Sequence, residues 1–384
     1  MFEIFWRFLI LGLVSFGGPV AHIGYFQKTF VDELKWLTQE SYTKLVAFAQ
    51  ILPGPSSSQV GFAIGLQRGG VFGAILAFVG FTTPSFLLMY FAATVGILDS
   101  NSILSGIVVG LKLFAVVIVA DAILSMYKSF CQTKLTIWIA LISALFLVFF
   151  SSILSTILAL MFFAIIGVIF IKSQKTDENL VSYKKINYIY LLSFIGIFLG
   201  LMIFGVYGEI FKFINAFYSS GSLVFGGGHV VLPFLQEYLK DFISTDSFLV
   251  GYGLAQSVPG PMFSFASYLG ADILDSSPFF GALIATIAIF LPGFLLVLAF
   301  YDSWEYYSSK KYVFGAVAGI NAAVVGLLIS AFISPVVTSA IFGFLDLFIA
   351  VVGLVVLRAY KIKVVYLIGV FCVIGVLILA FSNF

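Results

Sequence analysis

Long apolar runs separated by short polar stretches follow one another along the whole chain, and they predict membrane-crossing helices. A transmembrane helix needs about 20 consecutive, mostly apolar residues. Six such runs precede a polar stretch at residues 172–185, one follows it, and six more complete the chain. In order, they cover residues 3–31, 38–66, 70–96, 102–127, 134–150, 152–171, 187–206, 208–240, 245–272, 278–300, 311–334, 336–357 and 363–382. The pattern predicts an all-α, polytopic membrane protein with about 13 transmembrane segments.

Composition agrees with this interpretation. Of the 384 residues, 62% are hydrophobic and 9% are charged, whereas a soluble domain carries about 25% charged residues. The net charge of +2 is too small to indicate a nucleic-acid partner. The two cysteines, Cys131 and Cys372, lie far apart without companions, so we expect no disulfide framework, metal site or cofactor. The N-terminal run lacks a small-residue cleavage site and is expected to remain as the first helix.

The second half of the chain repeats motifs of the first. The phrase FGGP begins at Phe16, and FGGG begins at Phe225, an offset of 209. The phrase QILPGP begins at Gln50, and QSVPGP begins at Gln256, an offset of 206. Several colinear markers at nearly one spacing indicate an internal duplication. We therefore expect a first repeat at 1–171, a loop and linker span at 172–207, and a second repeat at 208–384.

The single linker span makes the second repeat enter the membrane from the opposite side, so the repeats are predicted to be inverted. Cytoplasmic loops carry an excess of lysine and arginine. This rule places the N-terminus and the 172–185 loop in the cytoplasm and Phe384 outside. Lys28 and Lys35 fit only if the first two segments, which are interrupted, re-enter the membrane rather than cross it. Crossing and re-entrant forms both keep the repeats inverted.

The two Pro-Gly-Pro motifs predict helices that break at membrane depth. Proline removes a backbone donor, and non-helical backbone is tolerated there only against protein or a water-filled cavity. A half-helix would begin after Pro55 with Ser56, Ser57 and Ser58 at its N-terminus, and another after Pro261 with Ser264. Free N–H groups and hydroxyls at a helix N-terminus favour an oxyanion, and paired interrupted helices mark a transporter's substrate site. The alternative is an ordinary proline kink.

Lys112 is predicted to lie near the middle of its span, where an intramembrane charge is usually functional. Asp121, nine residues later, falls on the opposite helix face and shares a face with Lys128 instead. Lys112 would then be free to face the cavity and counter a dianion. The alternative is a pair with a carboxylate on another helix.

The two histidines each follow a Gly-Gly break. His22 and His229 are the only histidines in the chain. Each is a candidate hydrogen-bond donor to an anion or a proton carrier, and the alternative is a packing residue. They are not equivalent, because an offset of 209 from His22 reaches Val231.

In combination, these motifs resemble the chromate transporter family, in its long-chain form with two fused halves. The resemblance covers essentially the whole chain, most strongly 12–90 and 221–300. It implies an inner-membrane carrier that expels chromate as a sulfate-like dianion and gives chromate resistance. The motif residues that it carries over as substrate-binding are Gly17, Gly18, Pro19, His22, Gln50, Pro53, Gly54, Pro55, Gly226, Gly227, Gly228, His229, Gln256, Pro259, Gly260 and Pro261.

Other functions stay open beside this expectation. A transporter or channel for another anion, such as sulfate, fits the same architecture. A membrane-embedded enzyme would need a catalytic motif, and no Gly-x-Ser-x-Gly, His-Glu-x-x-His or nucleotide-binding loop is present. We therefore expect no enzyme and no catalytic residue. The expected partners are a small oxyanion and the lipid bilayer, with a homodimer left open.

Overall fold

Helices build the protein, and no strand occurs among the described residues. This computed structural model describes residues 1–95, 102–171, 185–225, 227–308, 310–360 and 362–382. Most of the predicted 172–185 loop, Gly226 and Phe384 lie outside them. The elements are α1 (Phe2–Val14), α2 (Gly18–Phe26), η1 (Gln27–Glu33), α3 (Gln39–Ile51), α4 (Ser56–Thr94), α5 (Ser102–Phe130), α6 (Lys134–Phe149), α7 (Ile153–Phe170), α8 (Tyr188–Phe204), α9 (Glu209–Leu223), η2 (Gly228–Val230), α10 (Val231–Leu239), α11 (Thr245–Ala255), η3 (Met262–Ser264), α12 (Phe265–Ile273), α13 (Pro278–Phe300), α14 (Trp304–Ser308), α15 (Lys311–Ala331), η4 (Phe332–Val337), α16 (Phe344–Tyr360) and α17 (Val364–Ser382).

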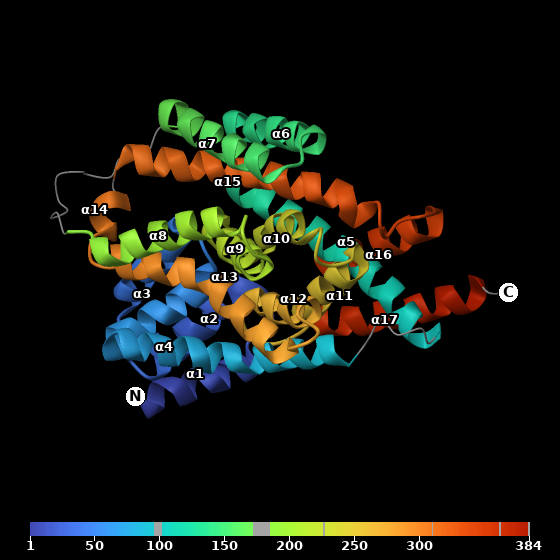
Figure 1. The fold of residues 1–384 in the computed structure, drawn as a ribbon, viewed down its shortest axis with the longest axis horizontal. Coiled ribbons are helices and arrows are strands. Elements are labelled where there is room, and N and C mark those ends of the chain that lie inside the picture. Colours follow the sequence, from blue (N-terminus) through green and yellow to red (C-terminus); the bar gives the residue numbers. More distant parts are fainter. Residues whose placement is uncertain (96–101, 172–184, 226, 309, 361, 383–384) are drawn as a thin grey trace.

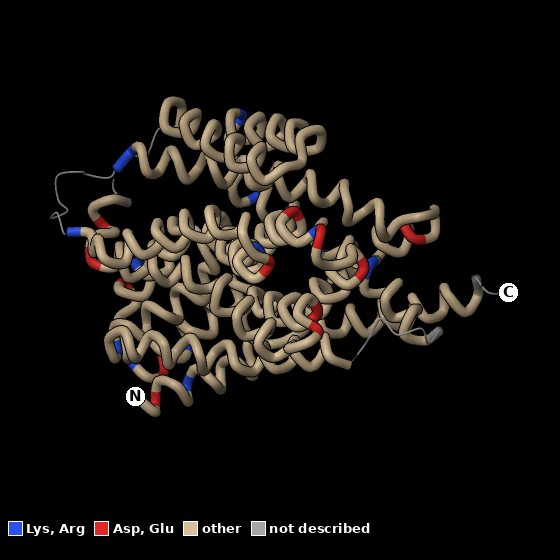
Figure 2. The backbone as a smooth tube through the Cα atoms, in the orientation of Figure 1, with Lys and Arg blue, Asp and Glu red and all other residues tan. Residues whose placement is uncertain are grey.

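Six helices among the described residues are long and apolar enough to cross a membrane: α4, α5, α7, α13, α15 and α17. Helices α6 and α8 are shorter but also apolar. Figure 2 shows long uncharged stretches along α7, α13 and α17. The prediction of an all-helical, multi-pass membrane protein is therefore confirmed.

One predicted boundary is wrong. The run at 336–357 was expected to be one helix, but α16 begins at Phe344. The chain before it forms η4, in which Ser334 has extended dihedral angles and Pro335 follows directly. Proline disfavours helical geometry at the preceding residue and removes a backbone donor, so the helix of α15 ends here and a turn precedes α16.

The first two predicted segments fold back as hairpins. Helix α1 has 13 residues, about 20 Å of helix, which is short of the ~30 Å hydrocarbon core. Helix α4 is kinked at Gly69 and Gly70, so its first part is equally short. The Arg68 guanidinium lies 5.0 Å from the centroid of the Trp36 ring, and Met1 packs against Gly69. The chain therefore returns twice to the end at which it starts.

The second half contains the same two hairpins. Near the start of α9, the Lys212 ammonium lies 4.9 Å from the ring centroid of Phe242, which follows α10. At the start of α11, the Ser247 hydroxyl donates to Asp272 at the end of α12 over 2.8 Å. Helices α9 and α10 thus return to one end, and so do α11 and α12. These contacts make each broken segment a hairpin whose two ends lie on the same side of the molecule.

Long helices from the two halves pack against one another. Helix α5 packs on α17 and α16, and α15 packs on α7 and α6 (Figure 1). Glycines allow the close approach: a Cβ on Gly106 would meet the Val376 backbone at 2.5 Å, and one on Gly315 would meet Gly167 at 2.6 Å. The core is continuous across both halves. Figure 1 places the two chain ends at opposite ends of the longest axis.

Candidate functional site

The four hairpin turns meet inside the protein and are bonded crosswise. The backbone N–H of Gly54 donates to the Val224 carbonyl over 2.8 Å, and the N–H of Gly260 donates to the Ser15 carbonyl over 2.9 Å. The glycines have φ of +124° and +96°, a left-handed region that side chains disfavour. Each Pro-Gly-Pro turn therefore holds the Gly-Gly turn of the other half.

A small cavity lies where these turns meet. Its volume is about 10 Å³, enough for roughly one water. The residues lining it come from both halves of the chain: Pro19, Pro55, Ser56, Ser57, Ser58, Gly228, Pro261, Met262 and Phe263. Seven of these residues, all except Met262 and Phe263, are among those that the sequence predicts as substrate-binding. Met262 and Phe263 were missed, because apolar residues in an apolar chain carry no signal of their own.

His22 positions one of the cavity serines. Its Nδ1 lies 3.2 Å from the Ser57 Oγ, and the residue is only 1% exposed. The imidazole packs edge-on against Phe81, with ring centroids 5.3 Å apart. The other nitrogen, Nε2, has no hydrogen-bond partner among the described residues. His22 therefore acts on the cavity through Ser57.

Buried polar atoms without a partner gather around the turns. Within the described chain, eight buried side-chain atoms have no hydrogen-bond partner. Among them are Ser15 Oγ, Ser58 Oγ, Thr82 Oγ1 and Gln256 Nε2. All four carry hydrogens, and an unpaired buried donor costs about 1–3 kcal/mol. These groups are therefore free to donate hydrogen bonds to water or to an oxyanion near the turns.

Gln59 is a further residue that the sequence did not single out. Its amide nitrogen donates to the Pro53 carbonyl over 2.9 Å and to the Gly293 carbonyl over 3.2 Å. The side chain is fully buried. Gln59 therefore ties the first Pro-Gly-Pro turn to α13. Its position, one turn into the half-helix that begins after Pro55, was the available signal.

The second half contributes differently. The Ser264 hydroxyl donates back to the Pro261 carbonyl over 2.7 Å, so it does not serve the cavity. His229 Nδ1 lies 2.8 Å from the buried Tyr252 hydroxyl on α11. The two histidines therefore have unlike partners, as their unequal spacing predicts.

The remaining motif residues form the turns or lie outside them. Gly17 and Gly18 have φ of +104° and +76° and make the break between α1 and α2. Pro53 and Pro259 begin the two Pro-Gly-Pro turns, and Gly227 precedes η2. Gln50 is the next-to-last residue of α3 and is exposed. Gly226 lies outside the described residues. The motif thus specifies backbone geometry more than direct ligands.

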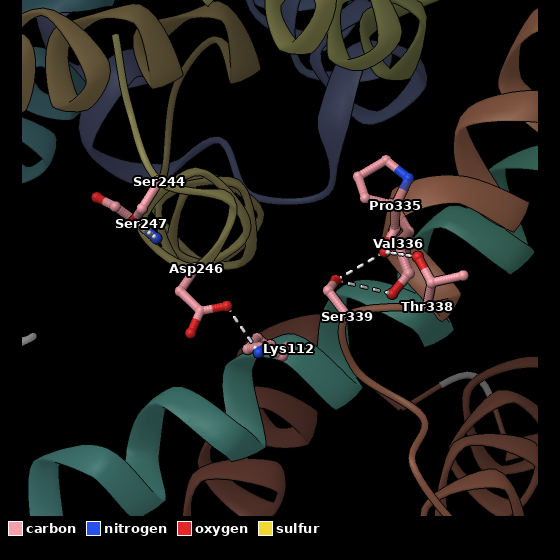
Figure 3. Close-up of polar contacts among 8 residues, drawn as sticks. All are labelled: Lys112, Ser244, Asp246, Ser247, Pro335, Val336, Thr338 and Ser339. Carbon is pink, nitrogen blue, oxygen red and sulfur yellow. Dashed lines mark hydrogen bonds and ion pairs between the residues drawn. The ribbon is translucent and has the colours of Figure 1, made fainter. Parts of the chain in front are cut away.

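Lys112 is paired and lies apart from the residues that line the cavity. Its Nζ contacts Asp246 Oδ1 at 2.7 Å, with the lysine side chain 12% exposed (Figure 3). The expectation of a free lysine facing the cavity does not hold, and the alternative, a carboxylate on another helix, is what the structure contains. Asp121 likewise pairs with Arg358 at 2.9 Å instead of with a cation on its own helix.

The described residues hold no group of three or more His, Cys, Asp or Glu side chains placed to bind a metal ion. The cavity lining itself is proline, glycine, serine, methionine and phenylalanine. Hydrogen-bond donation is therefore the chemistry that these side chains offer.

Comparisons with known proteins identify a family for this chain. A family model described as chromate transporter matches residues 2–168 and 211–376. An uncharacterized transporter of Methanocaldococcus jannaschii is 31% identical over 344 residues, covering 85% of this chain and 82% of its own. A chromate transport protein of Pseudomonas aeruginosa is 26% identical over 333 residues (85% and 79%). Another from Cupriavidus metallidurans is 27% identical over 353 residues (85% and 80%). No solved structure matches.

Proposed function

Because this chain belongs to the chromate transporter family, we propose that it carries chromate, or a similar tetrahedral oxyanion, out of the cell across the inner membrane. Such export would give resistance to chromate. Two relatives are named chromate transport proteins. The physical support comes from the cavity between the four turns.

The observation that carries the proposal is the arrangement of donors around that cavity. Three serines at the N-terminus of α4 line it, and the Ser58 hydroxyl is buried without a described partner. The positive end of the helix dipole adds to the hydroxyls. Hydroxyls and N–H groups bind an oxyanion without a fixed cation, so they allow its release on the far side.

We propose further that the halves are inverted repeats, 1–171 and 208–384, joined by α8. Three features support this. The family matches both halves. The Pro-Gly-Pro glycine of each half makes an equivalent bond to the other half: Gly54 to Val224 and Gly260 to Ser15. The N- and C-terminal ends lie at opposite ends of the molecule (Figure 1).

Transport in this account requires the turns to separate. A cavity of about 10 Å³ is too small for a tetrahedral oxyanion, since it holds about one water. The re-entrant hairpins meet the bilayer midplane from both sides, so parting one pair of turns opens the cavity to one face. Alternating access is commonly the movement of one repeat against the other around a fixed site.

The membrane potential favours export. A dianion leaving a cell that is negative inside gains about 4.6 kcal/mol per 100 mV, twice the single-charge figure. That energy corresponds to a gradient of roughly a thousandfold. Export therefore needs no coupled ion, whereas uptake works against the same field.

Flux into proteoliposomes tests the proposal. Purified protein is reconstituted, a potential is imposed, and uptake of chromate, sulfate, molybdate and phosphate is compared. We expect saturable chromate flux that follows the potential. Flux that stays linear with concentration would indicate a channel. No chromate flux from well-folded protein would contradict the proposed substrate.

A further inference from the structure

The cavity has one wall from each half of the chain: Ser56–Ser58 from the first half, and Met262 and Phe263 from the second. The two walls occupy equivalent positions but differ chemically. At the offset of 206, Ser56, Ser57 and Ser58 correspond to Met262, Phe263 and Ser264. We propose that this asymmetry makes the site prefer tetrahedral anions with three oxygens and one weakly hydrated substituent, as in thiosulfate and the sulfonates. The inference rests on the proposed function only in taking the cavity as the anion site.

The first-half wall is a set of donors. Ser57 is held by His22 at 3.2 Å. The Ser58 hydroxyl is buried, at 4% exposure for the residue, and has no partner among the described residues. The N-terminus of α4 adds free backbone N–H groups. This side therefore offers hydrogen-bond donors to the oxygens of a bound anion.

The second-half wall offers no side-chain donor from Met262 or Phe263. Both are buried, at 5% and 2% exposure. The Phe263 ring packs against Phe290, with centroids 5.7 Å apart. The Met262 sulfur lies 3.0 Å from the place where a Cβ on Gly228 would stand, so that glycine makes room for it. Ser264, which follows them, does not line the cavity, and its hydroxyl donates to the Pro261 carbonyl.

An anion whose four oxygens are all strongly hydrated, as in sulfate, is poorly matched to such a site. Sulfate would bury one charged oxygen against a thioether and a phenyl ring, and a buried charged group without hydrogen bonds is costly. Thiosulfate has the same charge and shape, but one terminal oxygen is replaced by a large, weakly hydrated sulfur. Chromate spreads its charge over longer bonds than sulfate and lies between the two. The apolar wall therefore favours tetrahedral anions in which one of the four substituents is weakly hydrated.

Uptake of ³⁵S-labelled thiosulfate and ³⁵S-labelled sulfate into proteoliposomes tests this inference, with chromate flux measured on the same preparation. We expect the half-saturation concentration for thiosulfate to be at least about tenfold below that for sulfate, the effect of one poorly paired charged group. In Met262→Gln, which adds a donor at similar size, the ratio should fall toward one. Met262→Leu should keep the ratio, and Met202→Gln, on the exposed face of α8, is the matched control. Should Met262→Gln fail to fold, Phe263→Tyr places a donor on the same wall.

The outcomes separate the two proposals. Equal half-saturation for thiosulfate and sulfate in a protein that transports chromate overturns this inference and leaves the proposed function standing. A wild-type ratio retained in folded Met262→Gln also overturns it. Strong thiosulfate transport without chromate transport supports the inference and contradicts chromate as the substrate.

Discussion

The backbone N–H of Gly54 donates to the carbonyl oxygen of Val224 over 2.8 Å. The two residues belong to different halves of the chain, and Gly260 makes the equivalent bond to Ser15. Each bond joins a Pro-Gly-Pro turn of one half to the Gly-Gly turn of the other, beside the cavity. Both glycines adopt left-handed dihedral angles, so the Pro-Gly-Pro motif joins the two halves through its backbone.

Replacing Gly54 with alanine should therefore destabilise the protein. A Cβ there would meet the Gly293 Cα at 3.0 Å and the Gln59 amide at 2.9 Å, and the strained φ costs about 1–3 kcal/mol. We expect a lower melting temperature in detergent and loss of chromate flux. Gly196→Ala, at an open position on α8, is the control. Normal stability and flux in Gly54→Ala would show that the turn does not require a glycine at this position.

His22→Ala should weaken anion binding without preventing folding. The imidazole orients Ser57, and a lost hydrogen bond of about 1 kcal/mol corresponds to several-fold in affinity. We expect a half-saturation concentration raised about five- to tenfold. In a double-mutant cycle with Ser57→Ala, the effects should not add, because the residues act as one unit. Additive effects would mean that His22 influences anion binding independently of Ser57.

Lys112→Met should affect stability rather than transport kinetics. Its ammonium pairs with Asp246 and lies outside the cavity lining. Asp246→Asn should give a similar fall in melting temperature, of a few degrees, and the double variant should be little worse than either single one. A tenfold rise in half-saturation for Lys112→Met, unmatched in Asp246→Asn, would place this lysine in the anion pathway.

The hairpins make a topological prediction. Trp36 lies against Arg68, so Lys35 and Arg68 should face the same compartment, the cytoplasm. With Cys131 and Cys372 replaced by serine, membrane-impermeant thiol reagents should fail to label Lys35→Cys in intact cells and should label Phe384→Cys. Labelling of both from outside would contradict the re-entrant arrangement and the inverted repeats.

The sequence predicted the helical class and the place of the breaks because both follow from strong local signals. Apolar runs mark the long helices, and Pro53 and Gly54 cannot continue one. The fold-back at each break was not predictable, since a run of 29 residues such as 3–31 is long enough either to cross or to return. It took the contact between Trp36 and Arg68 to decide.

The site was predicted less completely, for a different physical reason. Pro55 and Ser56 stand out in an apolar chain, whereas Met262 and Phe263 look like any lipid-facing residue. Lys112 stood out for its charge, and its own helix offered no partner on the same face. Its partner Asp246 lies 134 residues away, so only tertiary structure reveals the pair.

If the cavity is the anion site, chromate should protect a cysteine introduced as Ser58→Cys from an alkylating reagent. The Ser58 hydroxyl is buried at the cavity without a described partner, so a bound anion should cover a thiol at this position. In the Cys131→Ser/Cys372→Ser background, the account predicts that chromate slows alkylation with a midpoint equal to its half-saturation concentration for transport. Alkylation that stays unchanged while transport saturates would place the anion site elsewhere.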